Sequence, residues 1–451
     1  MTRVDDSVFE TFRSSLSGQL LRPDSEGYEA ARKVWNARFD RRPEAIVRCA
    51  DATDVVRAVD FGRTRKLLIA VRGGGHGFAG HSVCDGGMVI DVSLMKRCEV
   101  DPARRTARAE AGPTVGEFDA VTQGHGLATP MGACSAVGIA GLTLGGGEGY
   151  LTPKFGATCD NLISAEIVTA DGRLLRTSAA ENEDLFWAIR GAGANFGVVT
   201  SIEYRLHPVR ELLAGVVRHD FSQARSALRF LRDFAPTAPD ELALFTAFLP
   251  TGEERALDID AAYCGDLSLG EELLRPVRAF GHPSLEMAEP ISYLALQSLP
   301  GDIPSLTPIA MHRRDGFARE LSDEAIDVVI EHMGRAPSSA CGISVFYQHG
   351  AVCRVRPADT AFALREVGYL YWVHAFWQES SQMDALVQWV EDFFVALQPF
   401  STVSVYVNDL GDEGQERIRA AYESNYDRLA SLKKKYDPTN FFRLNQNITP
   451  A

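Results

Sequence analysis

Two nucleophilic side chains lie inside two glycine clusters of the sequence. His76 follows three glycines in residues 71–80, VRGGGHGFAG, and Cys134 lies near the start of residues 131–151, MGACSAVGIAGLTLGGGEGYL. An imidazole can act as a base or a nucleophile, and a thiolate can capture an electrophile. Glycine is costly to order and gives no side chain to a core, so this density indicates a ligand packed directly against main-chain amides.

Phosphate is the ligand that most often uses such a backbone, because consecutive N–H groups can surround an anion. Neither cluster matches a standard nucleotide motif. There is no GxxxxGK[ST], and GGGEG at residues 145–149 and GAGANFG at residues 191–197 both differ from GxGxxG. Glycine counting leaves a cofactor cradle and a set of tight turns equally open. A lone histidine beside glycine can also be a turn residue, and a free cysteine can be a small buried hydrophobe.

The order of several motifs decides between these interpretations. RGGGHG at residues 72–77 and GACSAVGI at residues 132–139 are followed by LTLGGGEGYLTPKFG, DNLISAEIVTADG and DLFWAIRGAGANFGVVTSIEYRL, and the chain ends with YDPTNFFRLNQNI before its last residues. Residues 42–209 thereby resemble the FAD-binding domain of the berberine bridge enzyme-like oxidases, within the vanillyl-alcohol oxidase superfamily. The last segment is similar to the family's C-terminal flavin-closing segment, and GYLTPKFG is particularly similar to bacterial 6-hydroxynicotine oxidases.

The resemblance implies how the cofactor is attached. The family's R-S-G-G-H motif carries a histidine bonded to the 8α-methyl group of FAD, and this role falls on His76. Its G-x-C-P-x-V-G-V motif carries a cysteine bonded to carbon 6 of the same ring, and this role falls on Cys134. Ser135 stands in place of the usual proline, and many bacterial relatives with a single covalent bond have valine in place of the cysteine. We therefore expect FAD bound covalently through His76, with Cys134 as a second attachment.

A larger set of cofactor-binding residues follows from the same motifs. These residues are Arg72, Gly73, Gly74, Gly75, His76, Gly77, Phe78, Gly80, His81, Gly132, Cys134, Val137, Gly138, Gly141, Leu144, Gly146, Gly149, Tyr150, Val199, Asn445 and Asn447.

The resemblance also implies an α+β fold. We expect a PCMH-type FAD-binding domain with two small α/β subdomains, and a substrate domain made of an antiparallel sheet covered by helices. The expected boundaries are residues 1–209 for the FAD-binding domain, 210–402 for the substrate-binding domain, and 403–451 for a C-terminal segment that returns to the FAD-binding domain. A length of 451 residues is consistent with about two domains.

The catalytic base is expected near the end of the substrate domain, where the family often has a tyrosine in a Y-x-N-Y run. Here the run is Tyr406-Val407-Asn408-Asp409, so Asp409 stands at the base position, and Tyr406 and Tyr347 are further catalytic candidates. Asp409 could accept a proton from an alcohol or pair with a cationic amine. The alternative is a solvated loop acid.

Further side chains on the expected pocket strands could grip an aromatic or heterocyclic substrate. These are Tyr347, Gln348, His349, Tyr371, Trp372, His374 and Trp377, and about half of them could equally be sheet packing. Phe78 stands where carbohydrate-oxidising relatives carry a tyrosine, which counts against sugar oxidation by their mechanism.

The resemblance favours an oxidase that takes hydride from an alcohol or amine carbon of a small substrate and reduces O2 to H2O2. Val137 stands where the family's small valine leaves oxygen a path to the flavin, and its alternative is a core valine. A flavin dehydrogenase with another acceptor and a flavin-binding protein without turnover remain open alternatives.

Composition limits the possible partners. Asp plus Glu number 60 against 46 Lys plus Arg, and the net charge of −14 makes nucleic acid or an anionic membrane surface an improbable partner. The first residues contain acids where a signal peptide needs an apolar run, so we expect a cytoplasmic protein. The eight cysteines form no CxxC pair, which excludes a zinc ribbon, and we expect no metal.

Hydrophobic periodicity predicts the elements that must position these residues. Expected helices of the first part lie at 5–16, 51–65, 115–124 and 184–190, and expected strands at 45–49, 67–71, 87–92, 106–111, 165–169, 174–177 and 198–206. Residues 138–149 contain too many glycines for a regular element. Expected helices of the middle part lie at 222–234, 270–280, 322–333 and 382–397, and expected strands at 242–249, 257–263, 342–347 and 369–376. The end is expected to contain a strand at 403–407, a helix at 413–436 and a turn at 437–440.

Overall fold

The first part of the chain contains a small, mostly parallel sheet. The computed structural model describes residues 5–251, 254–299 and 308–451. The first sheet has the order β1-β2-β4-β3, and its strands are β1 (Gln19–Leu21), β2 (Ala45–Arg48), β3 (Ile69–Arg72) and β4 (Met88–Asp91). Both β2 and β3 run parallel to β4, and α3 (Ala52–Thr64) connects β2 to β3. The first glycine cluster therefore follows the carboxyl end of β3. Ligand-binding loops of parallel sheets lie at the carboxyl ends of the strands.

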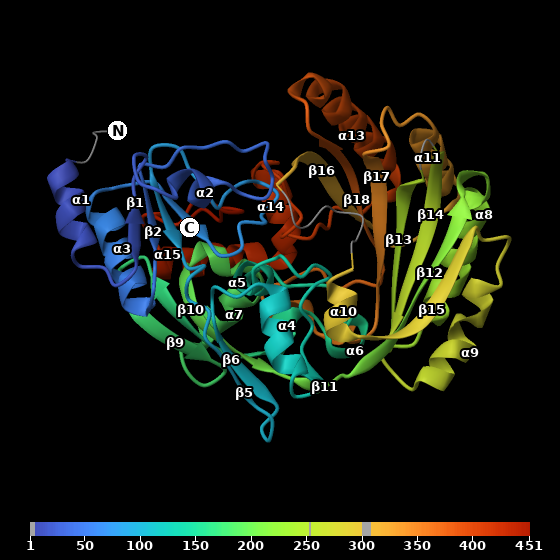
Figure 1. Ribbon diagram of the computed structural model, residues 1–451, viewed down its shortest axis with the longest axis horizontal. Coiled ribbons are helices and arrows are strands. Elements are labelled where there is room, and N and C mark those ends of the chain that lie inside the picture. The colour runs from blue at the N-terminus through green and yellow to red at the C-terminus, as the bar shows by residue number, and fades with distance from the viewer. Residues whose placement is uncertain (1–4, 252–253, 300–307) are drawn as a thin grey trace.

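A second sheet of five antiparallel strands lies beside the first (Figure 1). Its order is β5-β6-β10-β8-β9, and its strands are β5 (Cys98–Asp101), β6 (Thr106–Glu110), β8 (Leu162–Thr169), β9 (Leu174–Ser178) and β10 (Gly197–Arg205). The remaining elements of this part are α1 (Asp6–Arg13), α2 (Tyr28–Arg32), α4 (Val115–Gln123), α5 (Ile139–Leu144), α6 (Thr152–Phe155), α7 (Glu183–Ala192), and the pair β7 (Leu127–Ala128) and β11 (His207–Pro208).

The third and largest sheet has seven antiparallel strands in the order β15-β12-β14-β13-β17-β18-β16. Its strands are β12 (Glu211–Asp220), β13 (Leu242–Thr251), β14 (Glu254–Tyr263), β15 (Leu285–Ser292), β16 (Ala310–Ala318), β17 (Cys341–Gln348) and β18 (Gly368–Trp377). The helices of this part are α8 (Ala224–Phe234), α9 (Leu267–Arg278), α10 (Tyr293–Gln297), α11 (Asp323–Gly334), α12 (Ala351–Arg354) and α13 (Met383–Leu397).

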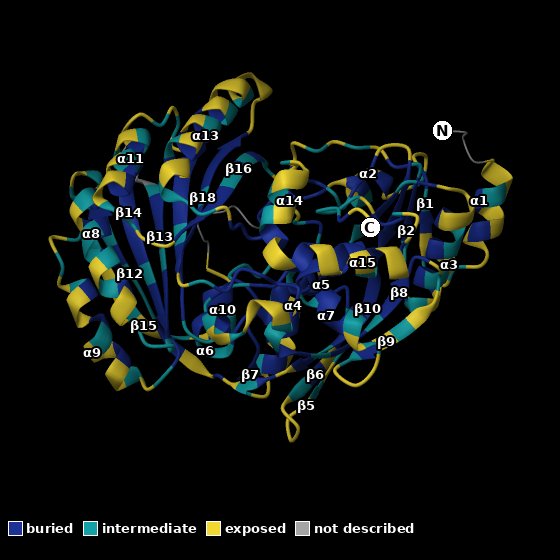
Figure 2. Cartoon of the chain, turned by 180° about the vertical axis from the view of Figure 1, so that it is seen from behind, coloured by how far each residue is buried: buried dark blue, intermediate teal, exposed yellow. Residues whose placement is uncertain are grey.

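The longer helices of this part cover one face of the large sheet, while the short helices α6 and α10 contact β13 and β12 on the other face. Helices α8, α11 and α13 pack on its outer face, and their outward sides are exposed while the strands beneath are mostly buried (Figure 2). Side chains alternate between the two faces of a strand, so every second residue points away from these helices. The opposite face looks toward the glycine clusters (Figure 1).

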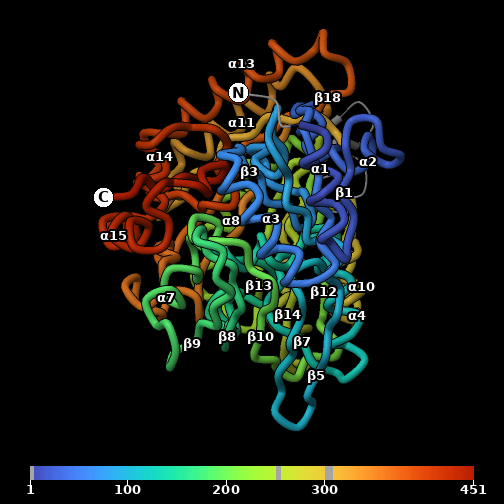
Figure 3. The backbone as a smooth tube through the Cα atoms, turned by 90° about the vertical axis from the view of Figure 1, so that its left-hand side faces the viewer, coloured from blue at the N-terminus to red at the C-terminus, as the bar shows by residue number. Residues whose placement is uncertain are grey.

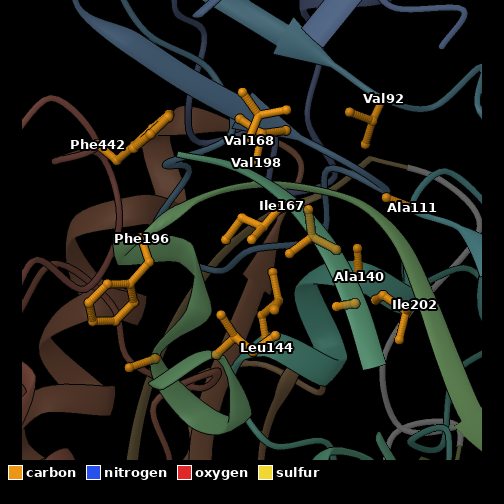
Figure 4. Close-up of a cluster of buried hydrophobic side chains, with 14 of the residues drawn as sticks. Val92, Ala111, Ala140, Leu144, Ile167, Val168, Phe196, Val198, Ile202 and Phe442 are labelled. Carbon is orange, nitrogen blue, oxygen red and sulfur yellow. The ribbon is translucent and has the colours of Figure 1, made fainter. Parts of the chain in front are cut away.

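The C-terminal residues pack into the core of the first part. Helix α15 (Tyr426–Tyr436) lies beside α7 (Figure 3), and α14 (Gln415–Tyr422) precedes it in the chain. Phe442 belongs to the same hydrophobic cluster as Leu144 of α5 and Ile167 and Val198 of the five-stranded sheet (Figure 4). Segments from both ends of the chain thus share one core.

The main differences between the structure and the sequence predictions concern residues 138–149, the C-terminal segment and three strands of the large sheet. Residues 138–149, expected to be irregular, contain helix α5, because the glycines leave room for Ile139 and Leu144 to enter the core. Residues 403–407 form no strand, and the helix expected at 413–436 is divided at Glu423, whose φ is 47°. Strands β12, β15 and β16 were not predicted, since their burial depends on neighbours distant in the sequence.

A buried ion pair fixes the turn after α15. Lys433 and Asp437 are both fully buried, and Lys433 Nζ donates to Asp437 Oδ2 at 2.7 Å, to Asn195 O at 2.7 Å and to Phe442 O at 2.8 Å. Asp437 in turn accepts hydrogen bonds from the backbone N–H groups of Phe441 and Phe442. Every donor of the ammonium group therefore has an acceptor, which is the condition under which a buried charge is tolerated.

We predict that Lys433→Met lowers the free energy of unfolding by about 3–5 kcal/mol, because it leaves the Asp437 carboxylate buried without its cation. Denaturant unfolding followed by circular dichroism measures the loss. The exposed neighbour Lys434 provides the matched control, and Lys434→Met should be close to neutral. Equal stability of the two variants would contradict the role assigned to the ion pair.

Candidate active site

The two glycine clusters meet backbone to backbone. A Cβ atom on Gly74 would lie 2.4 Å from Gly138 N, and one on Gly138 would lie 2.4 Å from Gly74 N. The start of α4 holds the second cluster in place, because Val115 N donates to Val137 O at 2.8 Å and Gly116 N donates to Ser135 O at 2.9 Å. The loops that carry His76 and Cys134 are therefore neighbours, and only glycine fits at their contact.

The first cluster presents free backbone donors. Among the residues that the structure describes, none of the backbone N–H groups of residues 73–79 donates a hydrogen bond to the protein. The loop is nevertheless anchored, since Trp35 N donates to Gly75 O at 3.0 Å and the Arg72 guanidinium donates to Ala31 O. Such a run of unpaired N–H groups is suited to an anionic or polar ligand.

His76 lies against an aromatic ring at the end of this loop. Its imidazole stacks on Trp35 with 5.4 Å between ring centroids and 18° between the planes. Burial lowers the pKa of His76 to about 4, and the positive charge of Arg72 contributes in the same direction. The ring is therefore neutral at pH 7, with an unshared electron pair available on one nitrogen.

The second cluster is fastened to the C-terminal segment. Gly147 N donates to Tyr406 Oη at 2.8 Å, and Asn408 Nδ2 donates to the same oxygen at 2.8 Å. A Cβ atom on Gly145 would lie 1.9 Å from Asn408 Oδ1, so the amide packs directly on the glycine backbone. Burial raises the pKa of Tyr406 well above its ordinary value. Tyr406 thus holds the loop in position, and its hydroxyl stays protonated.

Asp409 is a buried acid, so it is not the solvated loop residue that the sequence also allowed. Its side chain forms an ion pair with Arg313 on β16, with 2.8 Å between Asp409 Oδ1 and Arg313 Nη2. Burial raises the pKa of Asp409, and Arg313 opposes this shift. The Arg313 guanidinium also lies 4.0 Å from the centroid of the Phe78 ring, so it connects Asp409 to the first glycine cluster.

Arg313 and Asp315 are site residues that the sequence reasoning missed. They lie two positions apart on β16 and therefore on the same face, and their cross-strand partners on β18 are His374 and Trp372. Both carboxyl oxygens of Asp315 are buried without a hydrogen-bond partner, and burial raises its pKa well above the ordinary value, as do the charges of Asp409 and Glu413. The charged run Arg313-Arg314-Asp315 was the available signal, but β16 itself was not predicted.

Tyr347 lies on the wrong face of the sheet to be catalytic, so that prediction is wrong. Its ring packs on Tyr369 at 5.1 Å and belongs to the hydrophobic cluster under α8, α11 and α13. Tyr371 and Trp377 belong to the same cluster, and the Tyr371 hydroxyl is bonded to Ser401. Because side chains alternate along β17 and β18, the pocket candidates that face the glycine clusters are Gln348, Trp372 and His374.

The other predicted cofactor-binding residues occupy varied settings. Leu144 and Val199 are members of the hydrophobic core, and the Tyr150 ring packs against Phe245 at a tilt of 60°, with 5.1 Å between centroids. The side-chain oxygens of Asn445 and Asn447 are buried, and the described residues offer them no hydrogen-bond partner.

Burial lowers the pKa of His81 to about 4. The remaining predicted glycines frame the two loops: Gly132 touches Gly149, Gly146 and Gly80 have positive φ, and Gly141 is exposed.

The site contains the polar groups that FAD needs from a protein. The unpaired N–H groups of residues 73–79 can face phosphate or ring oxygens, and the orphaned Asn445 and Asn447 oxygens can accept hydrogen bonds from a ligand.

Among the described residues, no group of three or more His, Cys, Asp or Glu side chains is placed to hold a metal ion. Within the same residues, no helix combines the length and apolar character needed to cross a bilayer.

Comparison with known proteins agrees with this fit. A family model described as FAD binding domain matches residues 43–178, and a second, described as berberine and berberine like, matches residues 405–449. The chain is 32% identical over 450 residues to a FAD-linked oxidoreductase of Dictyostelium discoideum, covering 98% of this chain and 97% of that protein. It is 30% identical over 456 residues to (R)-6-hydroxynicotine oxidase of Paenarthrobacter nicotinovorans, covering 97% of each chain.

A solved structure confirms the predicted fold class. The crystal structure of 6-hydroxy-D-nicotine oxidase from Arthrobacter nicotinovorans matches with a TM-score of 0.90 at 28% identity, over 97% of this chain and 98% of that one. The relatives named above are FAD-linked oxidoreductases or oxidases, and the cofactor cradle seen here is the feature that such enzymes require. The chain therefore belongs to the berberine bridge enzyme-like family of FAD-dependent oxidoreductases.

Proposed function

We propose that the protein is an oxidase whose FAD is attached covalently through His76 and Cys134, and that it oxidises an alcohol or amine carbon of a small substrate at the expense of O2. The observation that carries the proposal is the contact between Gly74 and Gly138, because it brings the loops of the two nucleophiles together. A neutral imidazole and a free thiol are both competent to bond an electron-poor ring.

Each part of the chain has a distinct role in this proposal. Residues 1–209 and 403–451 form the FAD-binding domain, and residues 210–402 supply the substrate-facing sheet. Bound FAD supplies the hydride acceptor, while the protein positions it and the substrate. The unpaired backbone N–H groups of residues 73–79 orient the cofactor, and the Asn445 and Asn447 oxygens accept hydrogen bonds from it.

Asp409 is the proposed base. Its carboxyl group is buried beside Arg313, which holds it in one orientation and stabilises its ionised form. In that form it accepts the proton that a hydroxyl or amino group releases as the adjacent carbon loses hydride. Tyr406 acts as a positioning residue, because its hydroxyl is committed to Gly147 and Asn408.

The substrate class follows from two observations. Phe78 cannot ionise, and its ring is covered by the Arg313 guanidinium, which argues against a tyrosine-assisted oxidation of sugars. Trp372 and His374 face the same side of the sheet as Arg313, which supports a small aromatic or heterocyclic substrate. The relative named (R)-6-hydroxynicotine oxidase supports the same choice.

O2 is the proposed electron acceptor. Val137 lies directly beside the Gly74–Gly138 contact and is only partly buried, so its small side chain leaves space at the loop junction. A dehydrogenase that uses another acceptor is the second candidate. Oxygen consumption by the substrate-reduced protein distinguishes the two.

The attachment can be tested by acid precipitation. Yellow colour is expected to remain with the precipitated wild-type protein, and peptide mass analysis is expected to find flavin on the peptides that contain His76 and Cys134. His76→Ala should release most of the flavin on denaturation, whereas Cys134→Ser should keep it through the remaining bond. An unmodified Cys134 peptide would show a single attachment, and a colourless chain that refuses FAD would overturn the proposal.

The base can be tested with Asp409→Asn, which keeps the shape of the side chain but cannot accept the proton. We expect kcat to fall about 100- to 10,000-fold with an alcohol or amine that bleaches the wild-type flavin. Since the pKa of Asp409 is raised, wild-type kcat/KM should increase as pH rises through that pKa and the carboxyl ionises. Asp412→Asn changes an exposed acid nearby and is the matched control. Equal activity of the two variants would remove Asp409 from the mechanism.

A further inference from the structure

Glu148 is the only residue of residues 145–149 that carries a side chain, and its backbone is fixed on both sides. A Cβ atom on Gly147 would lie 2.1 Å from Thr158 Oγ1, and one on Gly149 would lie 1.9 Å from Gly132 O. Gly149 N also donates to Thr152 Oγ1 at 2.8 Å. The loop therefore cannot rotate Glu148 away without breaking these contacts, and it places one side chain beside the cofactor cradle.

The Glu148 carboxyl group has no partner in the protein. Both of its oxygens are buried, and neither forms a hydrogen bond with a described residue. A buried polar group without a partner is costly and uncommon in native structures. Its persistence in a fixed loop points to a ligand that supplies the missing hydrogen bond.

The neighbouring cation is not available to Glu148. All five N–H donors of Arg365 are used elsewhere: they go to Asp160, through both carboxylate oxygens, and to Phe362 O, Val352 O and Thr360 Oγ1. Arg365 is thus neutralised by Asp160 and offers Glu148 only a weak through-space attraction.

The other ionisable groups around Glu148 also favour its neutral form. Burial raises the pKa of Glu148 to about 8, the negative charges of Asp409 and Asp160 act in the same direction, and Arg365 opposes them. Tyr406 and Cys353 complete the ionisable surroundings, and burial keeps both protonated by raising their pKa values. At neutral pH the group is a carboxylic acid, whose O–H is a hydrogen-bond donor without an acceptor in the described residues.

We propose that Glu148 determines substrate specificity by donating a hydrogen bond to an oxygen or aromatic nitrogen acceptor of an uncharged substrate. The inference rests on the proposed function, because it places the substrate between the glycine loop and the sheet face that carries Arg313. Glu148 transfers no proton in this role. It selects substrates that have an acceptor in addition to the carbon that is oxidised, and Asp409 remains the base.

Infrared difference spectroscopy of the flavin-loaded protein tests the state of the carboxyl group. Wild type minus Glu148→Gln should show a carboxylic acid carbonyl band at about pH 6 that is lost by about pH 10, on either side of the raised pKa. Asp119→Asn is the matched control, because Asp119 is another fully buried acid with a raised pKa and its side chain contacts Gln297. The Glu148 band should survive in this control. Absence of the band at low pH would overturn the proposal.

Two probes of the same size test the specificity. Pyridin-3-ylmethanol and benzyl alcohol differ in one ring nitrogen acceptor, and their binding can be followed by perturbation of flavin absorption and by equilibrium dialysis. At pH 7 the wild type should prefer the pyridine by up to about tenfold, as one hydrogen bond allows. At the same pH, Glu148→Gln should keep the preference, because its amide N–H can still donate, and Glu148→Leu should lose it. Above about pH 8 the wild type should lose the preference as well, whereas Glu148→Gln should keep it.

Equal affinity of the wild type for the two probes, including no affinity for either, would overturn the proposal, as would a preference that survives in Glu148→Leu. These outcomes are separate from failure of the proposed oxidase function. A chain that holds FAD but is reduced by no alcohol or amine contradicts the oxidase function, while the carbonyl band and the probe affinities still report on Glu148.

Discussion

The close approach of Gly74 and Gly138 is the contact on which the rest of the site depends. With Gly138 N only 2.4 Å from the place where a Cβ of Gly74 would stand, any side chain at either position would force the loops apart. The entropy lost by ordering so many glycines must be offset by the packing of the elements that carry the two loops. Because the contact is made by backbone alone, both loops keep their side chains and N–H groups for a ligand.

The second organising feature is a group of buried acids in and around the glycine loops. Asp409, Asp315 and Glu148 come from three different segments, and burial raises the pKa of each. Arg313 forms an ion pair with Asp409, whereas the carboxyl oxygens of Asp315 and Glu148 have no hydrogen-bond partner among the described residues. Acids with perturbed pKa values concentrate where proton transfer or ligand recognition occurs, which agrees with a site between the sheet and the loops.

The fold alone does not specify the chemistry. Proteins of this architecture include (R)-6-hydroxynicotine oxidase, chitooligosaccharide oxidase and a grass pollen allergen with glucose dehydrogenase activity. What distinguishes this chain is a small set of side chains on the shared scaffold: Phe78 under Arg313, Asp409 in the buried ion pair, and Glu148 in the glycine loop. Function in such folds is decided by the residues placed at the site.

The sequence by itself indicated the family and the cofactor through the order of its motifs, and most of the regular elements through hydrophobic periodicity, because motifs and periodicity are local patterns. The resemblance of these motifs to the family's motifs also placed His76, Cys134 and Asp409 among the residues of interest. Only the tertiary structure decided which face of a strand each side chain occupies: Tyr347 packs under the helices, whereas Arg313 and Asp315, on a strand that was not predicted, face the loops. The contact of Gly74 with Gly138 and the isolation of the Glu148 carboxyl group were equally out of reach, since both arise from segments that are distant in the sequence and are brought together by sheet packing.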